Sequence, residues 1–341
     1  MAFVDVLKGI GILAVMLGHR SFSEGLVQII YFFHMPLFFM ISGYLDQMNI
    51  ADIQGIKVIV KRKFARLMYP YFTLGILIIV YYTALEFFRT SMLDSVKLAK
   101  RVIALLYGNF IWENNIDYIG TLWFLPALFW ASVIANLLFM ILKKGKKQIW
   151  IAELVLLVLG YLWIYMYSEF QIRLPWCLDV AIIGTVFYLI GYQYKIWSVD
   201  KNKLTLFSIF SLLVGFVLSV LNVFYMENRD YVLLRPDMLR LNYGNLVLFI
   251  LGASLLSLSM FGITYFVCEK IEFKFLQKVG QLSLLIMVEH LYVFQILDIV
   301  LGRLGWNRWL ISFPLCFLIS FVLAICIERF MPILITLDKK S

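Results

Sequence analysis

The chain has 341 residues, of which 63% are hydrophobic and only 15% are charged, and its mean hydropathy is +0.90. Soluble globular proteins are about half apolar and about a quarter charged, so this composition excludes that class. The net charge of +9 does not indicate nucleic-acid binding, because basic residues of membrane proteins mostly set topology and meet anionic lipid. We predict an all-α polytopic membrane protein, since the apolar runs have helix-spanning length and lack the alternation of barrel strands.

Apolar segments in chain order predict about ten transmembrane helices. The predicted spans are about 3–20, 26–46, 68–88, 120–142, 149–167, 178–196, 204–225, 244–267, 279–300 and 309–332. We interpret residues 1–341 as one integral-membrane domain, and we expect the first segment to stay in the mature protein because it lacks signal-peptide features. The loops on one side carry 17 Lys and Arg against 11 on the other, which predicts that both termini are cytoplasmic.

The four cysteines of the chain do not indicate a metal site. They are Cys177, Cys268, Cys316 and Cys326, and no pair of them has the spacing of metal ligands. We interpret them as small apolar residues and expect no metal.

The first predicted span carries two groups that are costly in hydrocarbon, Lys8 and His19. They are eleven residues apart, so at about 100° per residue they face the same side of a helix, about 16 Å apart along its axis. A cation and an imidazole on one face could hold the two ends of one long ligand. Alternatively, Lys8 simply pairs with Asp5, three residues before it, or extends to the cytoplasmic face.

All three histidines of the chain fall within predicted spans. His34 lies in the second span and His290 in the ninth, next to Glu289. An intramembrane ionisable group indicates a functional site, although a packing role inside the bundle is the alternative for each histidine. Neighbouring residues differ by about 100° on a helix, so the sequence leaves open whether Glu289 or His290 faces inward.

Three loops also carry charged residues that suggest binding. Lys63 and Arg66 end the first cytoplasmic loop and suit either a topological anchor or a phosphate-binding edge. The outer loop 89–118 contains a stretch, 94–106, whose pattern predicts a helix lying in the interface, with a lid over an outward site as the alternative. The outer loop 226–243 mixes both charges; we interpret it as an ordinary solvated loop, with hydrogen bonds to a sugar as the alternative.

These residues lie in motifs that resemble the membrane-bound acyltransferase-3 family, most closely the fucose 4-O-acetylase-like sugar O-acetyltransferases. The matching motifs are Asp5 to Gly11, Gly18-His19, Phe33-His34-Met35-Pro36-Leu37-Phe38-Phe39, Ser42-Gly43-Tyr44, Lys63 to Pro70, Trp123-Phe124-Leu125-Pro126 and Gly280 to Leu284. In the family, the first helix often carries an Arg, ten residues and a His. Lys8 and His19 fit this spacing, but a lysine lacks the bidentate guanidinium fork.

The resemblance implies a membrane O-acyltransferase, and more specifically an O-acetyltransferase, in the cell membrane. Its donor would be cytoplasmic acyl-CoA, here acetyl-CoA, and its acceptor a hydroxyl of a cell-envelope or exopolysaccharide sugar. Lys8 would line the donor channel, and Lys63 and Arg66, which fit a basic pair of the family, would meet the phosphates of the donor. His19 would be the general base.

The chemistry of the reaction agrees with a histidine in this role. An alcohol is a poor nucleophile at neutral pH, and a buried imidazole favours its neutral, basic form. His34 would orient His19 or polarise the thioester, and Glu289 or His290 would complete the site. We favour direct transfer, with Ser42 as a conceivable covalent relay.

Two other functions remain open from the sequence alone. A transporter or flippase would use the histidines as a proton relay, although the chain lacks the paired halves with interrupted helices typical of many transporters. A glycan polymerase also spans the membrane many times, but usually has larger outer loops with arginines.

Overall fold

The structure is a computed structural model that describes residues 2–20, 23–48, 52–108, 119–142, 146–196, 201–304 and 309–335. The helices are α1 (Ala2–Arg20), α2 (Glu24–Leu45), α3 (Ile53–Lys63), α4 (Tyr69–Thr90), α5 (Ser95–Tyr107), α6 (Phe124–Ile141), α7 (Lys146–Phe170), α8 (Leu178–Ile196), α9 (Lys201–Glu227), α10 (Leu246–Cys268), α11 (Lys274–Gln281), α12 (Ser283–Arg303) and α13 (Trp309–Phe330). Short helical turns are η1 (Phe64–Met68), η2 (Ile119–Trp123), η3 (Pro175–Cys177) and η4 (Pro332–Leu334).

The predicted fold class is confirmed: the described part of the chain is helical, and ten of its helices are long and apolar enough to cross a membrane. Nine of the ten predicted spans begin and end within a few residues of the observed ones. The cytoplasmic position of the termini and the single domain stay predictions.

The third span differs from its prediction, because one continuous helix runs from Ile53 to Thr90. Asp52 caps its start by accepting a hydrogen bond from Gly55 N at 2.8 Å. Inside it, η1 is a π-helical turn, and Tyr69 N bonds Phe64 O, five residues back. Pro70 has no N–H to donate to the carbonyl four residues earlier, which favours this local change of register.

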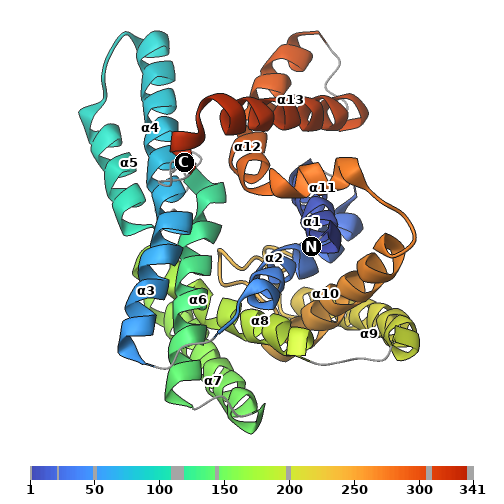
Figure 1. Cartoon of the computed structure of the whole chain (residues 1–341). Helices are drawn as coiled ribbons and strands as arrows, with labels where there is room; N and C mark the ends of the chain where they lie inside the picture. Colours follow the sequence, from blue (N-terminus) through green and yellow to red (C-terminus); the bar gives the residue numbers. More distant parts are fainter. Residues whose placement is uncertain are drawn as a thin grey trace. The chain divides into compact units, whose positions relative to one another are not determined.

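The chain forms two compact units, and the first comprises Met1–Asp46 and Phe187–Cys326. In this unit α1 packs against α2, α10, α11 and α12 (Figure 1). Small residues permit the closest approach: a Cβ at Gly9 would overlap the backbone oxygen of Leu276, and one at Gly280 would overlap that of Asp5. α11 therefore lies directly on the backbone of α1, which is the kind of contact that glycine allows between membrane helices.

The second half of α8 packs on α2 in the same way. A Cβ at Gly43 would overlap the backbone oxygen of Tyr188, and one at Gly191 would overlap that of Met40. The Tyr188 hydroxyl, in turn, donates to the carboxylate of Asp46 at the end of α2. These contacts hold α2, which carries His34, in a fixed register.

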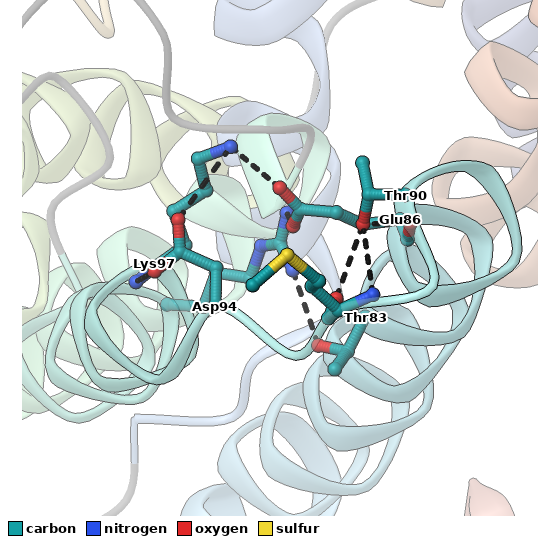
Figure 2. A network of polar contacts seen from close by, with 7 residues as sticks. Thr83, Glu86, Thr90, Asp94 and Lys97 are labelled. Carbon is teal, nitrogen blue, oxygen red and sulfur yellow. Dashed lines mark hydrogen bonds and ion pairs between the residues drawn. The ribbon is translucent and has the colours of Figure 1, made fainter.

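The second unit comprises Gln47–Val186 and Ile327–Ser341. Within it α5 docks on the end of α4 through a polar network, drawn in Figure 2. Arg101 is only 6% exposed and donates to Thr83 Oγ1 and Glu86 Oε2, both at 3.1 Å. Asp94 caps α5 by accepting from Lys97 N at 3.0 Å. The helix predicted at 94–106 is thus present, and Arg101 is tied to α4 rather than left exposed.

Candidate active site

The three histidines lie on three helices of the first unit, and His19 links them: its ring lies against that of His290 on one side and against Tyr31, which also contacts His34, on the other. The ring centroids of His19 and His290 are 5.3 Å apart. Tyr31 is 6.1 Å from His19 and 4.9 Å from His34 by the same measure, and its Oη is 3.5 Å from His19 Nδ1. We call His19, Tyr31, His34 and His290 the histidine cluster.

Local sequence explains why α1 and α2 bring these side chains together. Ser23 caps α2, its side chain accepting from Leu26 N, so the second helix begins shortly after the first ends. Gly18 lets the helices approach next to His19, since a Cβ there would lie 3.0 Å from Ile30 Cγ2 and 3.2 Å from the Tyr31 ring.

His290 and His34 are buried and share one hydrogen-bonding pattern. His290 is 0% exposed and His34 is 5% exposed. Their Nδ1 atoms bond the carbonyl oxygens of Ile286 at 2.9 Å and Ile30 at 2.7 Å, so we assign the ring proton to Nδ1 in both. Nε2 then keeps its lone pair, and that of His290 is buried without a partner among the described residues.

His19 differs from the other two histidines because its side chain is exposed. Its Nδ1 is within reach of the Tyr31 hydroxyl, and its ring lies against that of buried His290. When Nδ1–H donates to Tyr31, Nε2 is free to accept a proton. Of the three imidazoles, His19 is therefore the one most open to a substrate.

Glu289 does not join the histidine cluster. It is half-buried, its Oε1 has no partner among the described residues, and it interacts electrostatically with Cys316 of α13. The question that the sequence left open is answered for His290, which is the residue of the two that faces α1.

Arg20 fixes the end of α1 next to His19. Its terminal nitrogens donate to both carboxylate oxygens of Asp298 on α12, one at 3.0 Å. Its Nε is 3.4 Å from Ser312 Oγ on α13, and its guanidinium lies 5.6 Å from the Phe294 ring centroid. We call these contacts of Arg20 with Asp298 and Ser312 the clamp; its partners are too far apart in the chain to be predicted from the sequence.

The loop 228–245, between α9 and α10, contributes a second residue that sequence reasoning missed. The Arg235 guanidinium lies 4.4 Å from the centroid of the Tyr31 ring and interacts electrostatically with His19 and His34. The sequence distinguishes Arg235 from the other two arginines of this loop only by the proline that follows it.

The same loop is exposed at Arg229, Asp230 and Arg240, as expected for a solvated loop, but its middle part is folded. Asp237 and Asn242 exchange two backbone hydrogen bonds at 2.7 and 3.0 Å, and Met238 and Leu241 are buried. Burial raises the pKa of Asp237 above its ordinary value of 3.8, although the backbone N–H and guanidinium of Arg240 act in the opposite direction. The backbone pairing of Asp237 with Asn242 fixes the shape of this part of the loop, and burial of Met238 and Leu241 stabilises it.

The residues predicted to bind the donor are Lys8 on α1 and, in the second unit, Lys63 and Arg66. Lys8 Nζ is 3.1 Å from Asp5 Oδ1, with both side chains about a quarter exposed, so the alternative of a simple pair is observed. Lys63 and Arg66 belong to the second unit: Lys63 ends α3 half-buried, and Arg66 is exposed in the π-helical turn. No group of three or more His, Cys, Asp or Glu in the described ranges is placed to hold a metal.

Ser42, the conceivable covalent relay, donates its hydroxyl to the carbonyl of Phe38 at 2.9 Å. This is a bond to the helix's own backbone, as is common for a serine within a membrane helix.

Comparison with known proteins adds one finding. A family model described as an acyltransferase domain matches residues 1–329. Neither a curated protein nor a solved structure matches the chain. The matched range includes the whole histidine cluster, Arg235 and all of the residues predicted to bind the donor.

Proposed function

Because the chain belongs to the acyltransferase-3 family, we propose that it is a multi-pass O-acyltransferase that moves an acetyl group from cytoplasmic acetyl-CoA to a sugar hydroxyl. The acceptor we propose is a sugar of the cell envelope or of an exopolysaccharide. The observation that carries this proposal is the convergence of three histidines from α1, α2 and α12, with one imidazole open and two buried.

The reaction proposed for the site is direct transfer with His19 as general base. His19 Nε2 accepts the proton of the acceptor hydroxyl while the hydroxyl oxygen attacks the thioester carbonyl carbon. The tetrahedral intermediate then loses the C–S bond, and the departing thiolate takes the proton from the imidazolium. Tyr31 orients His19 through Nδ1, and the lone pair of His290 Nε2 accepts a hydrogen bond from the bound acceptor or from His19.

The donor is proposed to meet the cationic residues. Lys63 and Arg66 bind the phosphates of the CoA moiety, because clustered ammonium and guanidinium groups suit phosphate oxygens. Lys8 acts on the donor from α1; its helix position is about 16 Å from His19 along the axis and on the same face.

The test uses purified full-length protein, labelled acetyl-CoA and a set of candidate glycans. His19→Gln removes the base but keeps a polar side chain, and we expect acetyl transfer to fall by about 10²- to 10⁴-fold, the usual contribution of a general base. Acetyl-CoA binding is expected to remain, which separates loss of chemistry from loss of folding. Transfer at a near wild-type rate by His19→Gln would overturn the role of His19. If the wild-type protein transferred label to none of the glycans, the proposed function would be overturned.

The donor site has its own variants in the same assay. Lys63→Ala combined with Arg66→Ala is expected to weaken acetyl-CoA binding. Lys57→Ala combined with Lys61→Ala removes the same charge from exposed positions of α3 and serves as the matched control. Equal binding by both double variants would contradict the specific role of Lys63 and Arg66.

A further inference from the structure

Arg235 is placed over the histidine cluster by a folded loop. Its guanidinium lies 4.4 Å from the centroid of the Tyr31 ring, the residue that touches both His19 and His34. Asn242 Nδ2 donates to the carbonyl of Arg235 at 3.0 Å, and Asp237 pairs with Asn242 through the backbone. The cation is thus held by a fixed backbone beside the open imidazole.

This guanidinium interacts electrostatically with Asp237 of its own loop, but no carboxylate forms a close ion pair with it among the described residues. Arg20 is paired with Asp298, and Arg240 Nε is 3.5 Å from Asp237 Oδ2. Across the part of the chain that the structure describes, Arg235 makes no ion pair, and its Nε is buried without an acceptor. The nearest carboxylate along the loop, Asp237, also accepts the backbone N–H of Arg240 at 3.2 Å.

Arg235 as a whole is half-buried, but its Nε is fully buried, and a charged donor atom left without an acceptor there is costlier than a neutral one. The contact with the face of Tyr31 offsets part of that cost. A bound ligand would satisfy the donors that remain, and a planar guanidinium matches the two oxygens of a carboxylate or a phosphate.

We propose that Arg235 binds an anionic group of the acceptor, a carboxylate or a phosphate, so that the enzyme acylates a hydroxyl of an acidic sugar. This inference rests on the proposed function and names its substrate class. The anion sits over Tyr31, and the neighbouring hydroxyl of the same sugar reaches His19. Recognition of the anion thereby positions the hydroxyl that is acylated.

The experiment measures kcat/KM for matched acceptors with the full-length protein. One arm compares a uronic acid with its methyl ester, and a second compares a sugar phosphate with the same sugar without phosphate. Wild-type protein is expected to prefer one of the anionic acceptors, and Arg235→Gln to lose about 10- to 100-fold on it, as for a lost hydrogen bond to a charged group, with little change on the neutral partner. Arg235→Lys keeps the positive charge but not the two parallel N–H donors of the guanidinium. Its kcat/KM on the anionic acceptor is expected to lie between those of wild-type protein and Arg235→Gln.

Arg229→Gln is the matched control. Arg229 lies in the same loop over an aromatic ring, 5.6 Å from the centroid of Tyr225, but is exposed. The Arg229→Gln variant is expected to show the wild-type kcat/KM on the charged and on the neutral acceptors. Thermal unfolding of each variant shows whether the loop still folds, and Arg235→Lys keeps the test decisive if Arg235→Gln unfolds.

Two results would overturn the inference while leaving the proposed function intact. One is equal rates for wild-type protein on the anionic and neutral acceptors. The other is an equal loss on both by Arg235→Gln, which would assign the guanidinium to the oxyanion of the intermediate. The proposed function itself fails only if wild-type protein acylates no sugar at all.

Discussion

The ion pair between Arg20 and Asp298 is expected to hold His19 against His290. Arg20 follows His19 directly on α1, and Asp298 lies two helical turns after His290 on α12. The two are joined by a bidentate contact with side chains 25% and 36% exposed. Asp298→Asn keeps the size of the side chain but removes its charge, and therefore weakens both bonds.

The magnitude follows from the exposure of the pair. Exposed ion pairs contribute about 0 to 1 kcal/mol, and breaking a fully buried pair costs about 3 to 5 kcal/mol. A half-exposed bidentate pair should lie between these limits, so we expect Asp298→Asn to lower the free energy of unfolding by about 1 to 2 kcal/mol. Because the clamp ends next to His19, acetyl transfer should fall by about tenfold, an estimate based on the sensitivity of catalysis to small displacements.

The assay is a double-mutant cycle in detergent solution, with Arg20→Gln, Asp298→Asn and the double variant. Thermal unfolding and single-turnover transfer are measured for each. A coupling free energy of about 1 kcal/mol or more is expected, with losses of transfer that are not multiplicative. Arg303→Gln, an exposed arginine of the same helix, is the control and should change stability by less than about 0.5 kcal/mol.

If the stability changes of Arg20→Gln and Asp298→Asn simply added up in the double variant, the clamp would be refuted. Coupled stabilities with unchanged transfer would refute only its role in positioning His19, because the pair would then hold the helices without affecting the chemistry.

Two further predictions concern packing and pH. Gly43→Ala should destabilise the protein by about 3 kcal/mol in thermal unfolding, which is the upper end for overpacking. The reason is that its Cβ would overlap the backbone of Tyr188, which cannot rotate away as a side chain can. Asp237 has a raised pKa in the folded protein, so the stability it contributes is complete below its ordinary value of 3.8 and is lost as pH rises through the folded value. The stability of wild-type protein relative to Asp237→Asn should therefore decline with rising pH in unfolding measurements between about pH 4 and 7.

Each of these has a control or a contradicting result. Gly302→Ala is matched to Gly43→Ala, since no atom lies within 4 Å of a Cβ at Gly302, and it should stabilise α12 by up to about 1 kcal/mol. Equal effects of the two alanines would contradict the packing argument. For Asp237, a stability difference that stays constant with pH would show that its folded pKa is not raised.

The sequence by itself determined the membrane class and the positions of nine spans, because hydropathy over about twenty residues is a local property. It failed at the third span for a physical reason. The helix there starts at Ile53 with a basic, amphipathic segment, and passes through the π-helical turn before Pro70. Neither feature resembles a continuous apolar run, so the apolar window began fifteen residues too late.

The histidines could also be read from the sequence, since an ionisable group inside an apolar span is conspicuous wherever it lies. Only the tertiary structure decided which groups meet them. In it, His290 faces α1 and Glu289 lies outside the histidine cluster. Arg235 of a distant loop lies over Tyr31, and Arg20 pairs with Asp298, 278 residues later in the chain. Such contacts depend on how helices rotate and dock, and no local pattern along one segment contains that information.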